Sequence, residues 1–162
     1  MAKVERAKSC SADVGKYNKA LVRAKGEMLL ELSRNEEVEE KKAVSFKSFI
    51  RSGNFILEAY FEKEEGDGVP ALWLSTANVE LIAGKSYDIK PYGSPKAVAA
   101  LYGRKTPSGI EGDAWGEGTF NVSTVSFEPK GFISGSFSFK YTNQQGQQIT
   151  VTVVDTFTIE DD

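Results

Sequence analysis

The feature that most constrains this chain is a period-two alternation of apolar and polar residues from about residue 44 to the end. It is clearest over residues 133–142, where apolar residues and one glycine occupy the odd positions and Ser, Lys or Thr the even ones. Such alternation is typical of strands that bury one face. Turn-forming residues at 52–54 and 143–146 separate the runs. We therefore expect, over residues 43–160, an antiparallel β-sandwich or an up-and-down, lipocalin-like barrel of about eight strands.

Residues 11–35 follow a different period. Apolar residues recur there every three or four positions, which is typical of one face of an amphipathic helix. Gly15 and Gly26 each weaken such a helix by roughly 1 kcal/mol relative to Ala, so the predicted helix depends on packing. We expect its apolar face to cover the β-domain or to pair with a second copy of the chain. The residues of this candidate assembly face are Val14, Tyr17, Leu21, Met28 and Leu32.

Charge is unevenly distributed along the chain. Residues 1–25 hold seven basic and two acidic residues, a net charge of +5, and the other 137 residues carry −8. We interpret residues 1–10 as a flexible basic arm. Residues 36–42, which are Glu and Lys apart from one Val, are interpreted as a charged connector between helix and β-domain. The acidic body argues against nucleic acid as a partner.

Residue counts exclude several kinds of chemistry. The chain has no His, which removes His-based catalytic triads and the commonest metal ligand. It has one Cys, so neither an intrachain disulfide nor a thiolate zinc cluster can form. No apolar run approaches the roughly 20 residues of a membrane-crossing helix. With no nucleophile-and-base pattern visible, we expect a protein without catalytic activity, cofactor or bound metal.

Three segments resemble a group of uncharacterised small bacterial β-domains that often occur as envelope lipoproteins. They are IAGKSYDI at residues 82–89, GEGTFNV at 116–122, and the pair GFISGSFSF and GQQITVT within 131–152. The resemblance spans residues 44–160 and implies a β fold and a non-enzymatic role, without site residues. The N-terminus shows no signal peptide, which predicts a cytoplasmic location for the chain as written, or the periplasm or cell envelope if a signal was removed.

Aromatic residues near strand ends and loops are the best candidates for a binding site. Trp115 lies in the glycine-rich segment 103–118, which we interpret as a long loop. If the aromatic residues gather at one mouth of the fold, they line a ligand pocket or a protein-binding patch. If they are scattered, they are ordinary packing residues. The candidates are Trp73, Tyr92, Tyr102 and Trp115.

Asp155 lies two residues from each of the apolar residues Val153 and Phe157, so in a regular strand it would face the same side as they do. An unbroken strand would direct its carboxylate into the core, as a polar anchor at a cavity mouth. A bulge near residues 154–155 would instead turn it outward, and we favour this alternative because bulges often interrupt long strands. A second bulge is predicted between Val122 and Val125, where the apolar phase shifts.

Together these features predict a non-catalytic domain that binds a protein partner or a small ligand. Segment 103–118 and the N-terminal helix are its expected contact regions. The alternative is a self-assembling structural subunit, a homo-oligomer formed through the helix face. A third alternative is a hydrolase-type enzyme that uses carboxylates such as Glu117 or Asp155.

Overall fold

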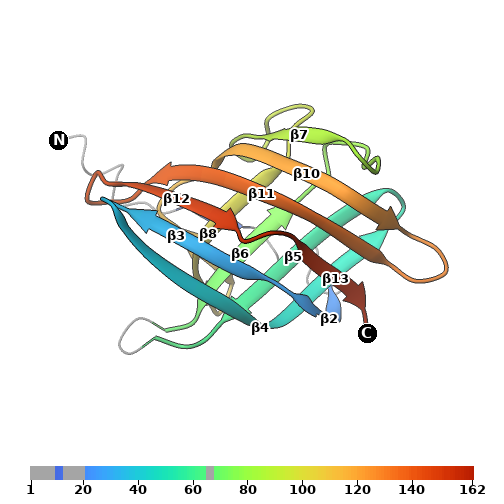
Figure 1. The fold of residues 1–162 in the computed structure, drawn as a ribbon, viewed down its shortest axis with the longest axis horizontal. Coiled ribbons are helices and arrows are strands. Elements are labelled where there is room, and N and C mark those ends of the chain that lie inside the picture. The colour runs from blue at the N-terminus through green and yellow to red at the C-terminus, as the bar shows by residue number, and fades with distance from the viewer. Residues whose placement is uncertain (1–9, 13–20, 65–67) are drawn as a thin grey trace.

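The computed structural model describes residues 10–12, 21–64 and 68–162 (Figure 1). Within these ranges the chain forms one sheet of thirteen strands and no helix, so the predicted antiparallel β class is confirmed with more strands than the eight expected. The strands are β1 (Cys10–Ala12), β2 (Val22–Glu27), β3 (Leu29–Arg34), β4 (Glu37–Arg51), β5 (Asn54–Phe61), β6 (Pro70–Ser75), β7 (Ser86–Ile89), β8 (Ala99–Thr106), β9 (Gly109–Gly112), β10 (Glu117–Ser126), β11 (Phe132–Thr142), β12 (Gln148–Val153) and β13 (Phe157–Asp161).

The sheet closes on itself. Antiparallel pairs run in the order β8, β6, β5, β4, β2, β13, β11, β10 and β7. Strands β3 and β12 pair with each other between β4 and β11, just as β2 and β13 do along another part of the same two strands. A parallel bridge between Ile89 and Val98 then joins β7 to the start of β8. In this bridge the Lys90 N–H donates to the Val98 carbonyl over 3.0 Å, and the Val98 N–H donates to the Asp88 carbonyl over 2.9 Å. This bridge joins the two ends of the strand order that runs from β8 to β7.

The main hydrophobic core lies inside the closed sheet. Its centre is a group of phenylalanines around Phe157, whose ring centroid lies 6.3 Å from that of Phe55, 6.1 Å from Phe120 and 5.8 Å from Phe137. All four are at most 2% exposed. They come from strands β5, β10, β11 and β13, so the core links strands distant in sequence.

A second apolar cluster lies on the opposite face of β5, β6 and β8. Neighbouring residues of one strand point to opposite faces, so Leu72 belongs to the main core and Trp73 to the second cluster. These three strands are therefore buried on both faces over much of their length. The buried members of the second cluster are Leu21, Ile56, Ala71, Trp73, Ala99, Leu101 and Ile110.

The predicted helix over residues 11–35 is wrong wherever the structure describes it, because residues 22–34 form β2 and β3. Ala24, Met28 and Leu32 are four apart, and an even spacing also places residues on one face of a strand. Ala24 and Met28 belong to the main core, and Leu32 packs against it. A Cβ on Gly26 would meet the Thr158 carbonyl oxygen at 2.0 Å, so glycine is required for the close β2–β13 approach.

Three smaller expectations also change. The predicted connector at 36–42 is mostly the first part of β4, and the predicted loop 103–118 contains the end of β8, all of β9 and the start of β10. Residues 1–9 of the predicted arm, and Val14 and Tyr17 of the candidate assembly face, lie outside the described residues. The predicted bulge is confirmed, since the β10–β11 register shifts between Val122 and Thr124.

Candidate functional site

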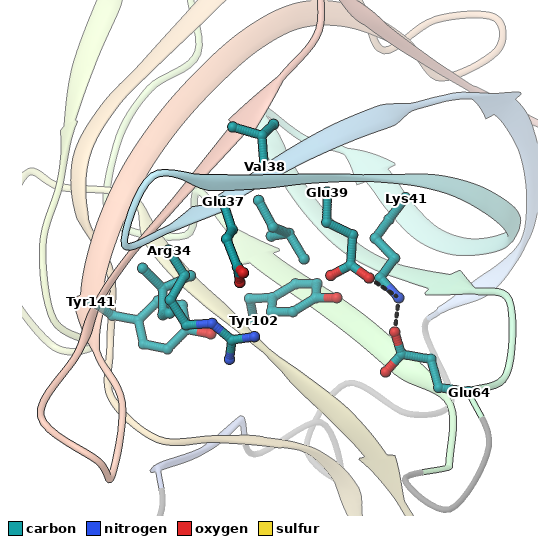
Figure 2. Close-up of a pocket in the computed structure, with 10 residues that line it drawn as sticks. Arg34, Glu37, Val38, Glu39, Lys41, Glu64, Tyr102 and Tyr141 are labelled. Atoms are coloured by element: carbon teal, nitrogen blue, oxygen red, sulfur yellow. Dashed lines mark ion pairs between the residues drawn. The ribbon is translucent and has the colours of Figure 1, made fainter.

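A cavity of about 550 Å³ is lined by residues of the β3–β4 and β11–β12 hairpins, among others (Figure 2). The two hairpins lie side by side at one end of the sheet (Figure 1). Its walls combine charged, aromatic and aliphatic side chains from five strands and one loop. The lining residues are Leu32, Arg34, Glu37, Val38, Glu39, Lys41, Glu64, Tyr102, Tyr141 and Ile149.

Strand register explains why these residues meet. Arg34 of β3 pairs with Glu37 of β4 on one side and with Ile149 of β12 on the other. Ile149 in turn pairs with Tyr141 of β11. Directly paired residues of adjacent strands present their side chains on the same face. The four side chains therefore form one row across four strands, at the rim of the cavity.

The start of β4 has an inverted pattern. Glu37, Glu39 and Lys41 line the cavity, while Val38 between them contributes only to its edge and has 59% of its surface exposed. Figure 2 shows Val38 on the other side of the β4 ribbon from these three residues. This wall was not predicted from the sequence, because a run of charges is usually a solvated segment. The available signal was the alternation of Glu37, Glu39 and Lys41 with residues 38, 40 and 42.

Lys41 joins the cavity wall to the β5–β6 loop. Its ammonium lies 3.5 Å from a Glu39 carboxylate oxygen and forms a second ion pair with Glu64 (Figure 2). The Lys41 side chain is only 13% exposed, so solvent screens these pairs less than it screens pairs on an open surface. Within the described part of the chain, Arg34 and Glu37 form no ion pair.

Two tyrosines form the aromatic part of the cavity. Tyr102 is 8% exposed and its ring lies 6.2 Å from that of Phe61, at the top of the main core. Burial raises the pKa of Tyr102, and the nearby Tyr141 and Glu39 raise it further. Burial raises the pKa of Tyr141 to about 12, with Asp113 adding to the shift and Arg34 opposing it. Both phenols therefore stay protonated at neutral pH and act as hydrogen-bond donors.

These two hydroxyls differ from those of Tyr60 and Tyr87, which have acceptors within the chain. The Tyr87 hydroxyl donates to the Glu80 carbonyl over 2.6 Å, and the Tyr60 hydroxyl donates to the Glu58 carboxylate. Among residues 10–12, 21–64 and 68–162, neither Tyr102 nor Tyr141 has a hydrogen-bond partner for its hydroxyl. The cavity therefore presents two donors that no described acceptor satisfies.

The predicted aromatic binding residues divide between two faces of the sheet. Trp73, Tyr92 and Trp115 do gather, with ring centroids 5.5 to 5.9 Å apart, on the outer face. Tyr102 belongs to the inner face, because it pairs with Leu72 of the main core. Trp73 is 1% exposed and Tyr92 is 51% exposed, so this outer aromatic cluster runs from the protein interior to its surface.

Of the remaining predicted residues, only Leu32 lines the cavity. Asp155 is exposed, with φ of 58°, at the break between β12 and β13. It does not line the cavity, and the outward alternative for its carboxylate holds. Leu21 lies in the second apolar cluster, while Met28 and Leu32 face the main core. The described part of the candidate assembly face is thus packed within the domain itself.

No protein-family model, curated protein or solved structure matches this chain. The resemblance to bacterial envelope β-domains therefore stays a prediction, and no relationship to an enzyme family is indicated. In the described residues there is no helix with the length and apolar character needed to span a bilayer. The same residues contain no group of three or more His, Cys, Asp or Glu side chains placed to hold a metal ion.

Proposed function

We propose that this protein is a non-catalytic binding domain that holds a small molecule in the cavity at the β3–β4 end. The observation that carries the proposal is the pair of tyrosine hydroxyls, from Tyr102 and Tyr141, that face the cavity without a described acceptor. Neither hydroxyl is among the fully buried polar atoms that lack a partner, so both are accessible from the cavity. A ligand that supplies an acceptor would form hydrogen bonds with them, each contributing about 0.5–1.5 kcal/mol.

The shape and chemistry of the cavity support this proposal. Its volume of about 550 Å³ lies within the range typical of small-molecule sites. Removing an uncompensated charge from water is costly, so charged residues that line a cavity favour leaving it open to solvent. Glu37, Glu39 and Lys41 line this cavity at the start of β4, and Glu37 and Glu39 are exposed there.

Native mass spectrometry of the protein purified from its own host tests the proposal. We expect a non-covalent small-molecule mass on the 17.7 kDa chain. A double change of Tyr102→Phe and Tyr141→Phe should remove this mass while preserving ring packing. Tyr92→Phe, the same change in the outer aromatic cluster, is the matched control and should retain the mass. A bare chain, or a bound mass that the double variant retains in full, would contradict the proposal.

A second candidate function is binding of a protein partner at the outer aromatic cluster. The observation that favours it is the stacking of half-exposed Tyr92 on Trp115, with ring centroids 5.5 Å apart. Exposed aromatic rings are common at protein interfaces. Tyr92→Ala should then weaken the complex without unfolding the domain. Retention of the partner by this variant would exclude the cluster as the contact.

A further inference from the structure

This inference rests on the proposed function and concerns the chemistry of the ligand in the same cavity. The two cationic side chains of the cavity differ in the number of carboxylates that they contact. Lys41 contacts two carboxylates, from Glu39 and Glu64. The other lining cation, Arg34, forms no ion pair with any described residue. The guanidinium of Arg34 is therefore the positive group with donors available to a ligand.

Arg34 and Tyr141 flank Ile149 in the inward row of side chains. Adjacent strands lie about 4.8 Å apart, so the two backbones are separated by about 10 Å with β12 between them. The long arginine side chain can cover much of that distance. Figure 2 shows the guanidinium and the Tyr141 phenol directed into the same part of the cavity. The effect of Arg34 on the pKa of Tyr141 agrees with this proximity.

The geometry points to a ligand that carries a carboxylate, held by the Arg34 guanidinium and the Tyr141 hydroxyl. The planar guanidinium presents paired N–H donors that match the two oxygens of a carboxylate. The phenol supplies a further donor to the same group. Leu32, Ile149 and the ring of Tyr102 line the neighbouring wall and would contact an apolar part of the ligand.

The core beneath the cavity limits the length of this ligand. Tyr102 packs on Phe61, which is 1% exposed. Leu30, Phe139 and Val151 fill the adjacent inward positions and are also at most 1% exposed. None of these packed core residues is among those that line the cavity. The site therefore fits a compact aryl or short alkyl carboxylate better than a long acyl chain.

Glu37 is expected to lower the affinity of the cavity for this ligand. It pairs with Arg34 in the β3–β4 register and lines the same cavity. Its carboxylate would repel a ligand carboxylate and compete with it for the guanidinium. Removing the charge of Glu37 should therefore strengthen binding, whereas removing the charge of Arg34 should weaken it. Opposite effects from two paired residues would be hard to produce by a general change in stability.

The test uses three probes of similar shape and different charge: benzoate, benzamide and benzylamine. Each is titrated at millimolar concentration into isotope-labelled full-length protein, and shifts of the Tyr141 and Ile149 amide resonances are measured. We expect benzoate to bind at least about tenfold more tightly than benzamide, the gain of a hydrogen bond to a charged group. Benzylamine should bind more weakly still. Lengthening the probe to dodecanoate should give no tighter binding than benzoate.

Arg34→Gln should weaken benzoate binding by about tenfold or more, and Glu37→Gln should tighten it severalfold. Arg51→Gln is the matched control, because it removes the same charge at the opposite end of β4 and should leave benzoate affinity unchanged. A thermal melt of each variant confirms that the fold is retained. If the Arg34 variant binds benzoate as tightly as the control, the carboxylate inference is wrong.

The outcomes separate this inference from the proposed function. Preferential binding of benzylamine at the same resonances would overturn the carboxylate assignment and leave a ligand cavity in place. Equal binding of all three probes would also overturn it, because charge would then have no role. If no probe shifts the cavity resonances and the native mass is bare, both the inference and the proposed function fail.

Discussion

The cavity at the β3–β4 end and the outer aromatic cluster both contain tyrosines, yet one is open and the other is filled. In the outer aromatic cluster, Trp73, Tyr92 and Trp115 pack within 5.5 to 5.9 Å of one another. In the cavity, Tyr102 and Tyr141 share the space with charged residues from β3 and β4. The charges account for the difference, because closing the cavity would remove them from water.

The two regions also differ in what they contribute to the stability of the fold. Aromatic contacts add about 0.5–1.5 kcal/mol beyond the burial of their apolar area, so the outer aromatic cluster mainly stabilises the fold. The cavity instead keeps two tyrosine hydroxyls and several charged side chains accessible, and it adds little packing to the fold. If the cavity binds a ligand, as we propose, the two regions should respond differently to substitution, and the following changes test that difference.

The largest effect is expected for Trp73→Ala. Trp73 is 1% exposed and contacts both other rings of the outer aromatic cluster, so its truncation leaves a large void. We expect a loss of about 3–5 kcal/mol in the free energy of unfolding, measured by urea denaturation. Trp73→Phe should lose less, since it keeps a ring and removes a buried indole N–H that has no partner. A loss below about 1 kcal/mol for the alanine variant would show that the cluster is not a packing element.

Trp115→Ala should have an intermediate effect. Trp115 is partly exposed and packs against the second apolar cluster from its edge. We expect a loss of about 1–3 kcal/mol in unfolding free energy, with the domain still folded. Benzoate titration should give the same affinity as the unchanged protein, because the cavity lies at another part of the sheet. A parallel loss of benzoate affinity would show that the two regions are coupled.

The sequence predicted the elements that depend on local chemistry. The turn at residues 143–146 is one example, where the Asn143 side chain accepts backbone N–H groups of Gln145 and Gln147 at 3.0 and 2.9 Å. The β10 bulge is another, because a phase shift in apolar residues is visible without any partner strand. In contrast, the even spacing of Ala24, Met28 and Leu32 fits both a helix and a strand. Only the neighbouring strands decide between the two.

The candidate site could be predicted only in part. Parity shows that Leu101 and Tyr102 face opposite sides of one strand, but the register with β6 is needed to place Trp73 beside Leu101. The cavity requires the register of β3, β4, β11 and β12 together, which joins Arg34 to Tyr141 across more than 100 residues of sequence. No local pattern contains that information.

Lys41→Met tests whether the charged wall also stabilises the cavity. This change keeps the aliphatic stem and leaves Glu39 and Glu64 without their shared cation. We expect a loss of about 1.5–2 kcal/mol, at the lower end of the range for hydrogen bonds to charged groups. Salt should reduce the difference by screening the two carboxylates. Lys42→Met, one position along on the exposed face of β4, is the control and should change stability by less than about 0.5 kcal/mol. Equal losses for the two variants would remove the role assigned to the ion pairs.

The smallest effect at neutral pH is expected for Tyr141→Phe, which keeps the ring and removes a hydroxyl without a described acceptor. A difference in unfolding free energy between this variant and the unchanged protein should appear at alkaline pH. Burial raises the pKa of Tyr141 from 10.0 to about 12, so between these pH values the unfolded chain releases a proton that the folded chain retains. The contribution of Tyr141 to stability is therefore complete below pH 10 and is lost as pH rises toward 12.

The Phe variant cannot lose that proton, and its unfolding free energy should fall less steeply over this window than that of the unchanged protein. Urea unfolding at a series of alkaline pH values measures both slopes. Tyr92→Phe, on the exposed side of the outer aromatic cluster, is the matched control and should leave the slope unchanged. Identical slopes for all three proteins would mean that Tyr141 is not held in a desolvated cavity, which would also weaken its assignment as a ligand donor.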